Sequence, residues 1–73
     1  MNTFTALWIN RLDQFGSTDM DLIITHDQGE IPEQRISKSF KMAANLIDTE
    51  FLSTIAEDEV ERIVAEWEAV NGV

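Results

Sequence analysis

The 73-residue chain carries fourteen acidic and five basic residues, which gives it a formal net charge of −9. A field of this sign repels phosphate backbones, so we expect no direct binding to nucleic acid. Cysteine is absent and histidine occurs once, which excludes a disulfide framework and a Cys/His zinc site. Because a chain of this length has apolar surface for one core only, residues 1–73 are expected to form a single domain.

The apolar content sets the class of protein. At 44% hydrophobic residues the chain is too apolar for a disordered acidic tail. Its longest purely apolar run, Ala6-Leu7-Trp8-Ile9, is far shorter than the ~20 residues of a membrane span. We expect a folded, soluble, cytoplasmic protein without membrane contact. Scaffolds below roughly 80 residues often need a further source of stability, so a homodimer stays open.

Residues 3 to 15 are predicted to form a first helix. Their apolar residues recur at steps of three and four, the period of one helical face. Thr3 is suited to cap the start of this helix, and Gly16 to end it. The apolar positions are Phe4, Leu7, Trp8, Leu12 and Phe15.

Residues 17 to 29 fit two patterns. In a helix, Thr18 is the cap and Gly29 the stop, with Met20, Ile23 and Ile24 on one face. In a strand, apolar and polar residues alternate from Met20 onwards, and Asp27-Gln28-Gly29 turns a hairpin at about 20–31. Pro32 would limit the second strand because it lacks a ladder donor.

From Pro32 the apolar spacing predicts another amphipathic helix. Its inward positions are Ile36, Phe40, Ala43, Ala44 and Ile47. Three cations at three-residue steps would form a basic stripe beside that face. These are Arg35, Lys38 and Lys41, and they are either neutralised by the acidic last helix or contact an acidic partner.

The last predicted helix begins at a capping box of Thr54 and Glu57 and runs to about Asn71, with Gly72 as its stop. Its inward residues are Val60, Ile63, Val64, Trp67 and Val70. Taken together, the elements predict an all-α fold, a small bundle of three to four short helices. The alternative is an α+β fold with a short hairpin at about 20–31 packed against the helices.

Catalytic chemistry finds little support in the sequence. His26 is the single imidazole and stands next to Asp27, an arrangement that arises often by chance. No serine lies in a nucleophile elbow, and the glycines at 16, 29 and 72 stand too far apart for a phosphate loop. We therefore expect no enzyme activity, no cofactor and no metal, with Trp8 and Trp67 in the core.

Residues 48 to 68 carry the strongest functional signal. They hold eight acidic residues against Arg62 alone, a local net charge of −7. Such a segment either keeps the chain soluble or docks on a basic protein surface, where its carboxylates take the place of phosphates. The candidate partner-binding residues are Asp48, Glu50, Glu57, Asp58, Glu59, Glu61, Glu66 and Glu68.

The functional hypothesis is therefore a non-enzymatic inhibitor or regulator. Its partner would be a basic surface, such as that of a nucleic-acid-binding protein. A small, acidic, cysteine-free composition is typical of proteins that phages and other mobile elements encode to block host defence. The alternative is a structural or assembly subunit, or a helical homodimer, held together by apolar contacts.

Overall fold

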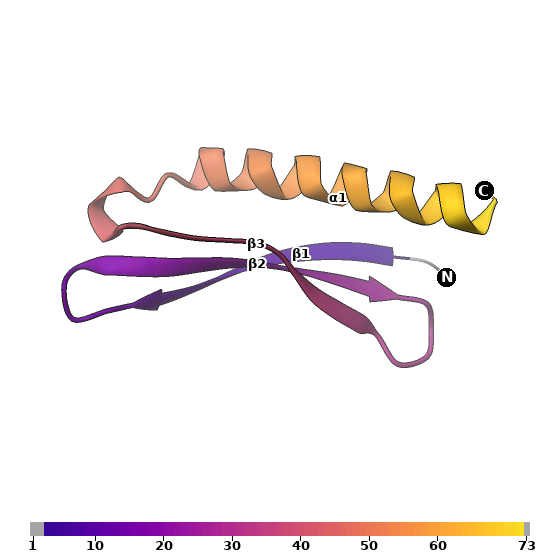
Figure 1. Ribbon diagram of the computed structural model, residues 1–73, viewed down its shortest axis with the longest axis horizontal. Coiled ribbons are helices and arrows are strands. Elements are labelled where there is room, and N and C mark those ends of the chain that lie inside the picture. Colours follow the sequence, from indigo (N-terminus) through magenta and orange to yellow (C-terminus); the bar gives the residue numbers. More distant parts are fainter. Residues whose placement is uncertain (1–2, 73) are drawn as a thin grey trace.

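The computed structural model describes residues 3–72 and shows a three-stranded antiparallel sheet with one helix over one face (Figure 1). The strand order is β1-β2-β3, so each strand pairs with its neighbour in sequence. The molecule is a thin slab of 46 × 23 × 15 Å. Its elements are β1 (Thr3–Leu12), β2 (Ser17–Asp27), β3 (Glu33–Ala43), the 3-10 turn η1 (Ala44–Leu46) and α1 (Thr49–Asn71).

The predicted all-α bundle is wrong, because three of the expected helical segments form the sheet. The error at residues 3 to 15 has a clear cause. Phe4 and Trp8 face α1 from β1, whereas Leu7 faces the opposite side of the sheet. A strand with apolar residues on both faces also satisfies helical steps of three and four. The β-branched residues of this segment favour the strand.

The segment with two readings, residues 17 to 29, is the central strand β2. Its alternation is strict: Thr18, Met20, Leu22, Ile24 and His26 are all buried on one face of the sheet, where Leu22 and Ile24 pack against α1. The alternative fold, with a hairpin at 20–31 packed against helices, differs as well. β2 begins at Ser17 and pairs along its length with β1 on one side and β3 on the other.

Two aspartate–glycine turns set the registers of the sheet. Between β1 and β2, Asp13 accepts hydrogen bonds from the backbone N–H groups of Phe15 and Ser17, and Gly16 has a φ of 79°. Between β2 and β3, the Asp27 carboxylate accepts from the Gly29 N–H at 2.9 Å. Such side-chain bonds replace the backbone bonds of a tight turn.

The predicted helix after Pro32 is wrong too, because this segment forms β3. A β-bulge changes which of its side chains share a face. The register with β2 shifts between Leu22 and Ile23, which leaves Ser37 as the extra residue. The bulge turns Arg35 and Lys38 to the same side although they lie three residues apart. Both reach acidic residues of α1. Lys41 lies on the opposite face, so the predicted basic stripe does not exist.

Helix α1 starts earlier than predicted. Asp48 is the N-cap, with its carboxylate accepting from the N–H groups of Glu50 and Phe51. Thr54 lies inside the helix, where its hydroxyl donates to the Glu50 carbonyl oxygen at 3.0 Å. The predicted stop at Gly72 is confirmed, since this residue is left-handed with a φ of 73°.

The core lies between α1 and the covered face of the sheet. Leu22 and Ile24 of β2 pack against Ile63 of α1, with Trp8 at the margin. The Trp8 indole N–H donates to the Leu52 carbonyl oxygen at 2.8 Å and so ties β1 to α1. Of the predicted inward helix positions, Val70 is exposed.

Candidate functional site

One of the eight acidic candidates, Glu59, is buried against the sheet. It is 8% exposed, and it accepts hydrogen bonds from the Ser37 hydroxyl and from Arg62 at 2.6 Å. The Lys38 ammonium lies 3.8 Å away. The hydrogen bond from Arg62, then that from Ser37, lowers the pKa of Glu59 to about 2, against the opposing effect of burial. Glu59 therefore holds α1 to β3.

Two further candidates have structural roles. Glu66 forms ion pairs with Arg62 at 2.6 Å and with Arg35 at 3.8 Å. Asp48 caps α1. We call the side of α1 that carries Glu59, Arg62 and Glu66 the β3 flank. The acidic residues of this flank form ion pairs with Arg35, Lys38 and Arg62, and the pairs with Arg35 and Lys38 connect α1 to β3.

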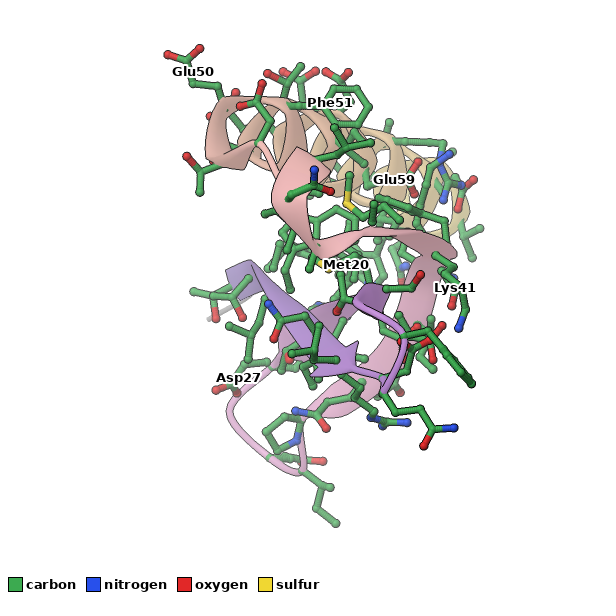
Figure 2. The ribbon with its side chains drawn as sticks, turned by 90° about the vertical axis from the view of Figure 1, so that its left-hand side faces the viewer. Met20, Asp27, Lys41, Glu50, Phe51 and Glu59 are labelled. Atoms are coloured by element: carbon green, nitrogen blue, oxygen red, sulfur yellow. The ribbon has the colours of Figure 1, made fainter. Side chains whose placement is uncertain are left out.

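The other five candidates are exposed, and four of them share one line along the helix. With 3.6 residues per turn, Glu50, Glu57, Glu61 and Glu68 fall within about 40° of one another around the axis. We call these four residues the acidic stripe. It is about 27 Å long at 1.5 Å per residue. Asp58 lies beside it, and Glu50 points away from the sheet (Figure 2).

The acidic stripe lies on the outer side of α1, opposite the buried helix residues Leu52, Glu59 and Ile63. Glu57 and Glu61 border a shallow groove whose floor is made of Ala6 of β1 with Ala56 and Val60 of α1. Small alanine side chains on both elements leave this hollow. β1 is a ten-residue edge strand that pairs with β2 alone in the described sheet, so its outer edge has no strand partner there.

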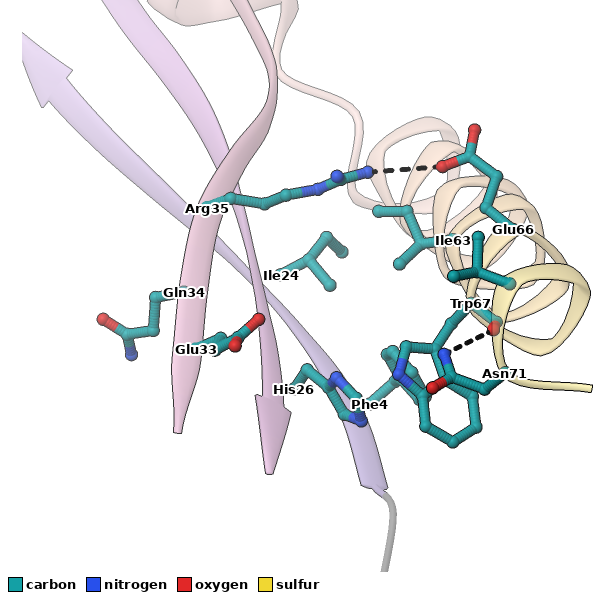
Figure 3. Close-up of a pocket in the computed structure, with 11 residues that line it drawn as sticks. Phe4, Ile24, His26, Glu33, Gln34, Arg35, Ile63, Glu66, Trp67 and Asn71 are labelled. Atoms are coloured by element: carbon teal, nitrogen blue, oxygen red, sulfur yellow. Dashed lines mark hydrogen bonds and ion pairs between the residues drawn. The ribbon is translucent and has the colours of Figure 1, made fainter. Parts of the chain in front are cut away.

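The single histidine lies in a second hollow, a cleft of about 310 Å³ between α1 and the end of the sheet (Figure 3). Its ring stacks on Phe4 with centroids 4.1 Å apart, and Trp67 meets it edge-on at 5.3 Å. Asp27 follows His26 on β2 and therefore points to the opposite face of the sheet. The His26-Asp27 neighbours thus form no acid–base pair, and the rings pack one another.

Ligand sites and relatives add no further assignment. Within residues 3–72, no group of three or more His, Cys, Asp and Glu side chains is placed to hold a metal ion. No helix in that part of the chain is both long and apolar enough to cross a membrane. No family model, curated protein or solved structure matches the chain. The functional evidence therefore lies in the geometry and charge of the molecule.

The sequence analysis did not distinguish the acidic residues that are paired within the fold from those that are free to contact a partner. The helical period alone places the acidic stripe on a different side of the helix from Glu59 and Glu66. The sequence did not reveal, however, that β3 carries Arg35 and Lys38 to one flank of α1. A signal was present in the i, i+3 and i, i+4 spacing of Arg62 with Glu59 and Glu66, which predicts ion pairs along one side of a helix.

Proposed function

We propose that this protein is a non-enzymatic, acidic protein-binding module that inhibits or regulates a target by docking the acidic stripe on a basic surface. The observation that carries the proposal is the difference between the β3 flank of α1 and the acidic stripe on its outer side. On the β3 flank, Arg35, Lys38 and Arg62 neutralise the acids. Among the described residues no cation pairs with the acidic stripe, so its charge is available to a partner.

The shape of the acidic stripe supports a macromolecular target. Carboxylates spread over about 27 Å match an extended basic surface better than a small ligand. A row of negative charges is also what a nucleic-acid-binding surface recognises, so a protein of that kind fits the proposal. The module would then compete with nucleic acid for its partner, as inhibitors of host defence encoded by phages and mobile elements do.

The physics of such docking makes it testable. Opposite fields speed up encounter, and salt screens them over about 10 Å at 0.1 M ionic strength. Association with the partner should therefore be fast at low salt and slow down as salt is added. Contacts at the groove beside Glu57 and Glu61 would add apolar area to the charge attraction.

The experiment compares two double variants with the same change in charge. Glu57→Lys with Glu61→Lys reverses the acidic stripe, whereas Glu30→Lys with Glu33→Lys reverses two exposed acids near the β2–β3 turn. Each immobilised protein is used to capture partners from a cell lysate over a range of salt concentrations, with quantitative mass spectrometry. We expect a basic protein that the unchanged chain and the turn variant retain, and that the stripe variant loses.

The captured protein is then purified and its association rate measured against salt. A stripe variant that binds it as fast, with the same salt dependence, would contradict the proposal. Circular dichroism of both variants checks that the fold survives. A cytoplasmic location is part of the proposal, and fractionation of the native host tests it.

A further inference from the structure

The side of the sheet away from α1 carries an apolar row across all three strands. Leu7 pairs with Ile23, and Ile23 pairs with Ile36. Leu7 is 63% exposed and Ile36 60%, with half-buried Ile23 between them. Ile9 extends the row along β1. Figure 1 shows α1 on one side of the sheet and none of the described elements over the other, which we call the open face.

Around this row the open face is polar and carries a small part of the chain's negative charge. Its near neighbours are Thr5, Thr25, Gln34 and Ser39. Asp21 lies beside the row, and towards its ends Arg11 and Lys41 stand against Asp13, Asp19 and Asp27, which gives a local net charge of −2 in a chain of −9. Lys41 already lies 3.3 Å from Asp19. The open face therefore carries less negative charge than the outer side of α1, and repulsion between two copies is weaker there.

The surface area of the chain is larger than that of a compact monomer. Its accessible surface is 5323 Å², whereas a compact monomer of its mass, 8.3 kDa, has about 4,600 Å². The excess of about 700 Å² is close to the ~800 Å² that each partner buries in a standard interface. The radius of gyration of 14.2 Å also exceeds the ~11 Å of a compact chain of this length.

We propose that the open face binds the open face of a second copy of this chain, in a two-fold symmetric dimer. The two sheets would pack about 10 Å apart, with the helices on the outside of four layers. A symmetric interface needs a patch that is complementary to itself. The row of Leu7, Ile23 and Ile36 meets this condition because it is apolar and nearly uncharged.

A second copy would also enlarge the small apolar core of the single chain. The buried apolar side chains of the described residues are Met20, Leu22, Ile24, Leu52 and Ile63, a small core for 73 residues. Dimerisation adds a second apolar layer beneath the same sheet. The proposal does not rest on the acidic stripe, which the dimer leaves exposed on both outer helices. One particle would carry two stripes.

The first experiment measures mass by sedimentation equilibrium over a range of micromolar concentrations. We expect the unchanged chain to have twice the mass of 8.3 kDa. Leu7→Thr with Ile36→Thr keeps strand-forming residues but removes the apolar row. Its dimer dissociation constant should rise about 100-fold or more, given four aliphatic side chains lost per interface.

The control is Ile31→Thr, which removes an equally large side chain, 89% exposed, in the turn after β2. This variant should remain a dimer. A monomeric unchanged chain would overturn the proposal and leave the open face to a different protein. A double variant that still dimerises would overturn it as well, and would indicate pairing through the edge of β1. Dissociation of the control variant would show apolar association without a defined face.

A second measurement does not depend on how the double variant folds. Because the chain has no cysteine, Ile23→Cys and Asp58→Cys each supply a single thiol. Ile23 lies at the centre of the open face, and Asp58 on the outer side of α1. A short bismaleimide should crosslink the first variant into a covalent dimer and leave the second monomeric on a denaturing gel. Equal crosslinking of the two, or none in either, would overturn the proposal.

Discussion

The β3 flank and the outer flank of α1 both carry acidic residues, but these residues have different roles. On the β3 flank, Glu59 and Glu66 are bound by three cations and by Ser37. On the outer flank, the acidic stripe faces solvent, and two of its residues, Glu57 and Glu61, border the groove at β1. The formal charge of a segment therefore does not give the number of carboxylates that a partner can contact. Intramolecular pairing decides which carboxylates remain available.

The largest expected difference between the flanks is in stability. Glu59→Ala removes the acceptor of Ser37 and Arg62 at a buried position, so we expect the free energy of unfolding to fall by about 2 kcal/mol. Glu57→Ala should change it by less than about 0.5 kcal/mol. Urea denaturation of both variants measures this. Equal losses would remove the distinction between the flanks.

At low pH, Glu59 should lose its stabilising effect on the fold. Its pKa is lowered in the folded chain from 4.5 to about 2, so the charged form stabilises the fold above pH 4.5. That contribution is lost as the pH falls from 4.5 towards 2. The stability difference between the unchanged chain and Glu59→Gln should therefore shrink over this window. Taking the difference cancels the titration of the acidic stripe, and a constant difference across the window would count against the assigned ion pair.

The helix cap predicts a smaller loss. Asp48 accepts two backbone hydrogen bonds at the start of α1, and Asp48→Ala should cost about 1 kcal/mol of stability. Asp48→Ser, which keeps a capping oxygen, should restore most of it. Thermal denaturation followed by circular dichroism compares the three proteins. If serine fails to rescue, Asp48 stabilises α1 through its charge at the helix N-terminus and not through the capping hydrogen bonds.

The smallest effect has the opposite sign. Glu57 and Glu61 are four residues apart in α1, where like charges destabilise a helix by about 0.2–0.5 kcal/mol. Glu61→Gln should therefore raise stability slightly at low salt, and the gain should vanish at high salt. Denaturation at two salt concentrations is the measurement. A loss of stability would mean that the acidic stripe has a structural partner.

The failed fold prediction has a physical explanation in β1. Phe4 and Trp8 pack beneath α1 while Leu7 and Ile9 stand on the open face, so the strand presents apolar residues on both sides. A helix-period pattern arises from such a strand by coincidence. If the open face binds a second copy, Leu7 and Ile9 are apolar because they belong to that interface, and this explains the helix-like spacing.

The sequence by itself determined the end of the last helix at Gly72, the acidity of residues 48 to 68, and the exclusion of disulfides. These follow from local chemistry: a left-handed glycine, a count of charges and the absence of thiols. Only the tertiary structure decided between sheet and bundle, because strand pairing is non-local. It also separated Glu59 from Glu57, since the bulge at Ser37 brings Arg35 and Lys38 to one flank of α1.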